Sequence, residues 1–268
     1  MNRATPVFRR GTAMDYGLQI SASGALANLH AQDTITNNLA NINTTGFKPL
    51  MTGTMFREAA RIEDNLPQLS SNSLLERLGS GVLSAHDMIN FAQGALESSS
   101  SEYDLAIEGD GFFLVGDPEN PALTRDGRFT LNADNKLVLT STGTPVLSSK
   151  QQEIEIDPNL GPIEVAGNGL IQQNGEAIAQ LGLSDVPNRG ALRPIGGGQY
   201  ARIDGSPLQL LDATGVVRQY HLEMSGSNEI DSLMKIQSAS RSAQSNIGMI
   251  DLQNRLISRA INTFGRLS

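Results

Sequence analysis

A stripe of small and apolar residues recurs at steps of four and three near the N-terminus. From about Tyr16 it comprises Leu18, Ala22, Ala25, Leu29, Gln32, Thr36 and Leu39. This spacing predicts a helix over 16–43 with one narrow seam. The helix should end where Asn43, Thr44, Thr45 and Gly46 follow, because these residues favour turns and glycine tolerates a positive φ.

A stricter seam runs through 229–266. Steps of three and four connect Leu233, Ile236, Ser240, Ala243, Ile247, Ile250, Asn254, Ile257, Ile261 and Phe264, and a second stripe adds Met249, Leu252 and Leu256. Two such helices can pack on each other within one monomer, or on copies of themselves. One partner helix rich in alanine and threonine covers little apolar surface, so we expect neighbouring subunits to cover the rest.

Between the helices the pattern changes to short strands separated by glycine turns, from Leu105 to about Met224. A hairpin with a type I′ turn is predicted at Asp126-Gly127, and further turns at Gly143 and at Asn174-Gly175. The segment EIEIDP alternates apolar and charged residues. Strands at 8–12-residue spacing indicate an all-β domain.

The whole pattern predicts an α+β fold. The terminal helices pair as a coiled-coil-like terminal domain, and a linker connects it to an all-β middle domain. The predicted segments are a disordered extension (1–15), an N-terminal helix (16–46), an extended linker with short helices (47–104), the β domain (105–226) and a C-terminal helix (227–268). The linker helices are expected at 55–66 and at 73–79, the latter with Ser73 as N-cap and Glu76 at N3. Met1 and Met14 are both possible starts.

Charge is divided unevenly along the chain. The total is −8, and residues 47–226 hold 12 basic against 23 acidic side chains, so the ends are slightly positive. Phosphate binding needs a clustered basic face, which argues against a nucleic-acid partner. The absence of cysteine excludes thiolate metal sites and disulfides. No run of residues reaches the length of a membrane span, and no apolar core follows the N-terminal arginines as in a secretory signal.

Residues with catalytic potential are scattered. His30, His86 and His221 are far apart in sequence, and no phosphate loop or nucleophile motif is present. The glycine clusters at 109–111 and 196–198 precede no predicted helix and are interpreted as turns. The hairpin accounts for Asp126. We therefore expect no enzyme activity, no cofactor and no metal.

The segment TNNLANINTTGFK, Thr36 to Lys48, resembles the N-terminal signature of the axial proteins that build the rod and hook of the bacterial flagellum. The signature positions are Asn37, Asn38, Leu39, Ala40, Asn41, Thr45, Gly46, Phe47 and Lys48. Further matches to this family are Gly79, Gly81, Val82, Gln93, Gly94, Leu96, Asp104, Ala106, Ile107, Gly109, Gly111, Phe112, Phe113, Thr124, Arg125, Gly127 and Phe129.

The resemblance implies a structural subunit of the flagellar basal-body rod, located in the periplasmic rod and transmitting torque from motor to hook. Its implied partners are copies of itself, other rod and hook proteins, and the flagellar export apparatus, without nucleic acid or membrane insertion. The expected assembly interface comprises Leu18, Ala22, Ala25, Leu29, Leu39, Leu233, Ile236, Ala243, Ile247, Ile250, Ile257, Ile261 and Phe264. Heterologous contacts between such surfaces generate filaments.

Three questions stay open at this point. The linker of roughly 55 residues and its GSGV element resemble the distal rod protein, whereas Arg241-Ser242-Ala243-Gln244 departs from the family pattern and keeps the proximal paralogue as an alternative. A different class is an exported β-domain adhesin or binding module with a coiled-coil oligomerisation stalk. A carboxylate-based hydrolase is the third candidate.

Overall fold

The computed structural model describes residues 13–58 and 81–264. Most of the expected N-terminal extension and of the two expected linker helices lies outside these residues. The described chain divides into two compact units. The helical unit comprises 13–36, 52–58, 81–87 and 230–264, and the β unit comprises 37–51 and 88–229. The architecture is α+β, as the sequence pattern predicts.

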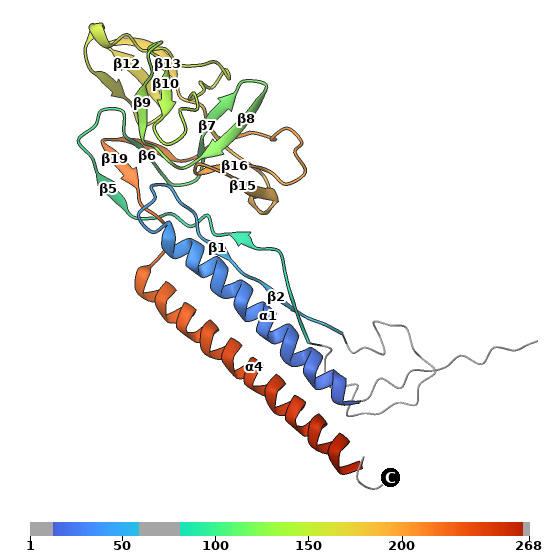
Figure 1. The fold of residues 1–268 in the computed structure, drawn as a ribbon. Helices are drawn as coiled ribbons and strands as arrows, with labels where there is room; N and C mark the ends of the chain where they lie inside the picture. The colour runs from blue at the N-terminus through green and yellow to red at the C-terminus, as the bar shows by residue number, and fades with distance from the viewer. Residues whose placement is uncertain (1–12, 59–80, 265–268) are drawn as a thin grey trace, which may run out of the picture. The chain divides into compact units, whose positions relative to one another are not determined.

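Two long helices make up most of the helical unit. Helix α1 (Ala13–Ala40) begins three residues before Tyr16, and α4 (Glu229–Phe264) runs antiparallel beside it (Figure 1). Helix α1 ends at Ala40, and the turn that follows closes at Gly46, whose φ of +66° is a conformation that favours glycine. In the part of the chain that the structure describes, no helix combines the length and hydropathy that a membrane span needs.

The described parts of the linker are extended. Strand β1 (Leu50–Met51) pairs with β4 (Met88–Ile89) in the β unit, and β2 (Thr54–Phe56) pairs with β3 (Val82–Ser84) in the helical unit. The prediction that a helix starts at Met55 is therefore wrong. Met55 alternates with Thr54 and Phe56 in a two-stranded ribbon, and its backbone hydrogen bonds go to β3 instead of to the next turn. The β3 end is anchored on α1, because the Ser23 hydroxyl accepts from the Val82 N–H.

The β unit is built from short antiparallel strands. They are β5 (Leu96–Ser98), β6 (Leu105–Glu108), β7 (Phe112–Asp117), β8 (Asn120–Thr124), β9 (Phe129–Leu131), β10 (Leu137–Leu139), β11 (Ile163–Val165), β12 (Leu170–Gln173), β13 (Glu176–Gln180), β14 (Leu183–Asp185), β15 (Leu192–Gly196), β16 (Gln199–Arg202), β17 (Leu211–Asp212), β18 (Val216–Gln219) and β19 (His221–Glu223). Two 3₁₀ turns cover Pro158–Leu160 and Arg189–Ala191.

The largest sheet has the order β15-β16-β8-β7-β14-β17. Strand β7 lies near its centre and is buried on both faces. Phe113 and Val115 belong to one apolar cluster, and Phe112 and Leu114 belong to a second. This explains the continuous apolar run of β7, because a strand covered on both sides has no polar face. The remaining sheets have two or three strands.

Two predicted turns are confirmed. Asn174 and Gly175 have φ of 52° and 83° and join β12 to β13, as a type I′ hairpin requires. Gly143 has a φ of 70°, and its N–H donates to the Leu139 carbonyl. In EIEIDP the alternation is also confirmed, since Ile154 and Ile156 are buried between exposed neighbours.

The hairpin predicted at Asp126-Gly127 is wrong. Strand β8 pairs with β7 and β16, β9 pairs with β10, and neither Asp126 nor Gly127 has a positive φ. Glycine is needed here for a different reason: a Cβ on Gly127 would lie 1.6 Å from the Leu105 carbonyl oxygen. The backbone at Gly127 passes close to the backbone of Leu105. The neighbouring side chains of Arg125 and Asp126 bind Glu223 and Arg128.

Candidate functional site

One stripe of α4 is buried and follows the heptad spacing. Its members are Ser232, Ile236, Ala239, Ala243, Asn246, Ile250, Gln253, Ile257 and Ala260, all buried or partly buried, at steps of four and three. Six of these nine positions hold small or polar side chains. The stripe facing the interior of the helical unit is therefore narrow and contributes little apolar area.

The two helices meet where glycine faces an amide. A Cβ added to Gly17 would lie 2.6 Å from Gln253 Nε2, and one added to Gly24 would lie 2.8 Å from Asn246 Nδ2. From the first pair to the second, the chain position rises by seven on α1 and falls by seven on α4. The two helices are therefore packed antiparallel in a heptad register. Glycine lets the backbones approach closely at these two points, and the side-chain amides of Gln253 and Asn246 occupy the space that a Cβ would take.

Large apolar side chains remain exposed on both helices after this pairing. On α1 they are Leu26 and Leu29, and on α4 they are Ile230, Leu233, Met234, Ile247, Met249, Leu252, Leu256 and Ile261. Ile230 is 72% exposed and Ile247 is 47% exposed. Exposed apolar surface of this extent is typical of surfaces that bind another molecule. We call these ten residues the exposed apolar rows.

The residues predicted for the assembly interface fall into three groups. Leu29, Leu233, Ile247 and Ile261 are exposed; Leu18, Ala22, Leu39, Ile236, Ile250 and Ile257 are partly buried; and Ala25 and Ala243 are buried. The side chain of Phe264 lies outside the described residues. The seam thus contains two adjacent rows with different surroundings, because a heptad stripe on a straight helix is wider than one partner helix can cover.

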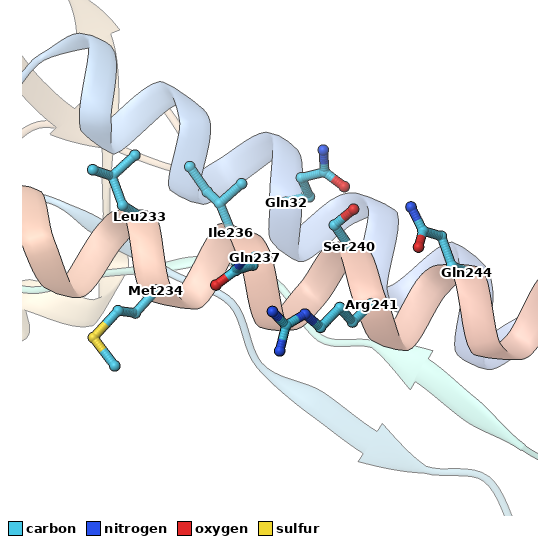
Figure 2. A pocket seen from close by; sticks show the side chains of 8 residues that line it. All are labelled: Gln32, Leu233, Met234, Ile236, Gln237, Ser240, Arg241 and Gln244. Atoms are coloured by element: carbon cyan, nitrogen blue, oxygen red, sulfur yellow. The ribbon is translucent and has the colours of Figure 1, made fainter.

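A groove of about 600 Å³ follows the first half of α4. Its lining comprises Gln32, Leu233, Met234, Ile236, Gln237, Ser240, Arg241 and Gln244. Figure 2 shows Leu233 and Ile236 projecting from α4 beside Gln32 of α1, with Met234 and Arg241 on the other side of the helix. Three of the lining side chains are apolar and five are polar.

A second feature, in the β unit, is a buried ion cluster centred on Glu223. Its carboxylate lies 2.5 Å from Lys48 Nζ and 3.0 Å from Arg125 Nη1, and it accepts from the Gly94 N–H at 2.8 Å. The side chains of Lys48 and Glu223 are each 1% exposed. Two cations and one anion are thus held together away from water, an arrangement that needs polar partners on all sides.

Lys48 is held by two further interactions. Its Nζ donates to the Ala92 carbonyl at 2.8 Å, and its backbone N–H donates to the Tyr200 hydroxyl. Burial lowers the pKa of Lys48 from its ordinary value, and the Glu223 carboxylate opposes that shift. Burial also raises the pKa of Tyr200 to about 12. Both shifts reflect the loss of solvent around the cluster.

Arg125 connects the cluster to the other sequence motifs. Its guanidinium donates to the Gly109 carbonyl at 2.7 Å and lies 5.3 Å from the centre of the Phe112 ring. The Gln93 amide accepts from the Gly109 N–H and donates to the Ile107 carbonyl. The residues matched to the family around 93–94, 107–112 and 125 therefore meet at one place.

Gly46 of the signature segment also contacts the ion cluster. A Cβ on this residue would lie 2.3–2.5 Å from the Arg125 carbonyl group, and the Gly46 N–H donates to the Glu223 carbonyl oxygen at 2.7 Å. Nearer to the helix, the Asn38 amide both donates to and accepts from the backbone of Leu50. Only an asparagine or glutamine side chain can imitate a peptide group in this way. The signature thus fixes the backbone that follows α1.

The three histidines are divided between the two units. His30 lies 3.0 Å from Asp87 in the helical unit, and His221 contacts the Gln219 carbonyl in the β unit. Among the described residues, no group of three His, Cys, Asp or Glu side chains could hold a metal ion. Asp126, interpreted from the sequence as a turn residue, binds Arg128 through both carboxylate oxygens.

Sequence reasoning missed Glu223 and Tyr200. Glu223 is one of many acidic residues, and the segment around it has no motif. The only available signal was indirect: Lys48 and Arg125 are basic residues within motifs of small and apolar residues, and a buried cation requires an anion. No sequence pattern identifies which of the 28 acidic residues supplies it.

Comparison with known proteins gives matches over most of the chain. The model for a flagella basal body rod protein matches residues 18–48, and the model for the D1 domain of flagellar hook protein FlgE/F/G matches residues 106–173. The flagellar basal-body rod protein FlgF of Caulobacter vibrioides is 31% identical over 95% of this chain and 100% of its own length. FlgF of Rhizobium meliloti is 30% identical over 94% of this chain and 99% of its own.

Relatives of a second name are equally similar. The flagellar basal-body rod protein FlgG of Buchnera aphidicola subsp. Schizaphis graminum is 30% identical over 90% of this chain and 97% of its own length. Identity alone therefore does not separate the paralogues, and the relatives give the adhesin alternative no support. The chain belongs to the flagellar basal-body rod protein family: it is a structural subunit of the rod of the bacterial flagellum, where it assembles with other axial proteins.

Proposed function

We propose that this rod subunit polymerises through the exposed apolar rows of α1 and α4, with copies of itself and with other rod and hook proteins as neighbours. The observation that carries the proposal is the exposure of eight large apolar side chains on α4 after the helix has paired with α1. Water-exposed area of this kind gives a driving force for association, since each buried side chain stabilises by about 1.5–3 kcal/mol.

The row of α4 that faces α1 and the exposed row of α4 differ in their side chains, and this difference supports the proposal. The row that faces α1 contains Ala239, Ala243, Asn246 and Gln253, which hold the helices together weakly but in one register. The exposed row contains Leu233, Ile247 and Ile261 on the same helix. Within the predicted interface, the exposed members are therefore the contacts between subunits, and Ala25 and Ala243 support them from inside.

A substitution in the exposed row tests this assignment. Ile247→Asp places a carboxylate in the proposed interface, where an unpaired buried charge costs several kcal/mol for every subunit. In a strain lacking its own copy of the subunit, we expect the variant to be stable but to leave rods unassembled and cells unable to swim. Ser245→Asp adds the same charge two residues away at an exposed polar position and should assemble normally. Normal swimming with Ile247→Asp would contradict the proposal.

The proposal includes no catalytic step. It does include delivery by the flagellar export apparatus, with the N-terminal segment of the chain as the part that the apparatus recognises. This rests on the family resemblance. Deleting residues 2–13 tests it: the shortened chain should accumulate inside the cell, and its appearance outside the inner membrane at normal levels would overturn the assignment.

A further inference from the structure

The strands that complete the β unit come from the end of its sequence. Strand β18 pairs with β6, β19 pairs with β5, and Val217 is part of the larger apolar cluster. Glu223 ends β19 and contacts Lys48, 175 residues earlier, and Arg125, 98 residues earlier. The cluster is thus assembled from three segments that are far apart in the chain, and Glu223 is the last to be synthesised.

The chemistry of the cluster makes this order consequential. Without Glu223, Lys48 and Arg125 would be two cations without a counterion in a site from which water is excluded. Burying them in that state is strongly unfavourable. The carbonyl groups of Ala92 and Gly109 remain as acceptors, but they carry no charge. The signature segment around Gly46 and Lys48 can therefore dock stably only when the carboxylate has arrived.

We propose that Glu223 delays completion of the β unit. The unit cannot finish folding before residues 216–223 are present, so a chain that emerges N-terminus first stays incompletely folded until almost the whole unit is available. The value of this delay for export rests on the proposed function, because an early-folded β unit would obstruct passage of the remaining chain. The delay itself is a property of the folding reaction and is testable without export.

Folding kinetics of the full chain supply the test, followed by circular dichroism of the β unit in a urea series. Glu223→Gln keeps the size of the side chain and removes its charge. We expect its unfolding rate to rise at least about 100-fold while its folding rate changes less than about threefold, because a contact made after the transition state acts on unfolding. Glu108→Gln removes an exposed partner of Arg218 and should change neither rate more than about threefold.

A second variant keeps the test decisive if Glu223→Gln does not fold. Lys48→Met in the Glu223→Gln background removes one of the uncompensated cations and should restore folding, with an unfolding rate at least about tenfold lower than the single variant. Folding slowed about 100-fold with unfolding unchanged would show that the cluster forms early, and would overturn the proposal. Unchanged rates in both directions would overturn it too. Swimming is not a readout, so failure of the assembly surface leaves this test unaffected.

Discussion

Asn246 of α4 lies against Gly24 of α1 so closely that a Cβ on the glycine would come within 2.8 Å of the Asn246 amide nitrogen. Gln253 and Gly17 repeat the relationship seven residues away. Polar side chains at seam positions of coiled coils fix register at a cost in stability. The helix pair of one subunit behaves in the same way. Its register is specific, but its stability is low because it buries few large side chains.

Gly24→Ala should therefore destabilise the helix pair, although alanine is the better helix former. The new methyl group has to displace the Asn246 amide, and overpacking of this kind costs about 1–3 kcal/mol. Gly248→Ala on α4 is the matched control, since nothing lies within 4 Å of its Cβ position, and it should stabilise the helix by about 1 kcal/mol. Helical circular dichroism during urea unfolding measures both. Adding Asn246→Ala to Gly24→Ala should restore most of the loss, and a failure to do so would place the clash elsewhere.

Hydrogen exchange of the purified subunit should show two levels of protection. We expect a monomer in which amides of 13–36 and 230–264 exchange much faster than those of the strands around Phe113 and Leu139. The reason is that helices held by a narrow, partly polar seam open locally at low cost, whereas the β unit opens only by unfolding. Equal, slow exchange in both helices of a dilute monomer would contradict this expectation.

Ile250→Asp should behave differently from Ile247→Asp. Ile250 belongs to the stripe facing the interior of the helical unit and is partly buried, whereas Ile247 is exposed. A carboxylate at 250 should reduce the helical signal of the monomer as well as rod assembly, while the melting of the β unit stays unchanged. A carboxylate at 247 should reduce assembly alone. If both variants lose the same helical signal, the distinction between the two rows is wrong.

Gly127→Ala should unfold or severely weaken the β unit. Its Cβ would lie 1.6 Å from the Leu105 carbonyl oxygen, which is backbone and cannot move aside. We expect a loss of at least about 3 kcal/mol in the free energy of unfolding, in the range of large steric effects. Gly143→Asn is the comparison, because that glycine has a positive φ but open space around it. Its cost should stay near or below about 1 kcal/mol. Comparable losses in the two variants would contradict the steric explanation.

The buried phenol of Tyr200 should make stability depend on alkaline pH. Its pKa is raised to about 12 by burial, so the folded state holds the proton more tightly than the unfolded state, whose tyrosine titrates near 10. The stabilisation is fully present below about pH 10 and is lost as pH rises towards 12, up to about 2–3 kcal/mol. Tyr200→Phe removes this contribution, so the difference in unfolding free energy between the two proteins should shrink between pH 9 and pH 11.5. A constant difference would mean that the phenol titrates normally.

Local patterns determined a large part of this structure from the sequence. The heptad spacing gave both long helices, Asn174-Gly175 gave a hairpin because both residues tolerate a positive φ, and the alternation around Ile154 gave its burial. These features depend on neighbours a few residues away, so the chain itself carries the information. Asp126-Gly127 carried the same local signal as a hairpin turn, and the prediction was wrong because the glycine is needed for the close passage of Leu105.

The tertiary structure alone decided two matters. It decided which row of the α4 seam faces α1, because the choice depends on where Gly17 and Gly24 let the backbones approach, and Leu233 and Ile247 had the same heptad pattern as the row that is buried. It also decided that Glu223 is the counterion of Lys48 and Arg125. Electrostatic partners are selected by proximity in space, and a sequence separation of 175 residues leaves no trace of that proximity in the sequence.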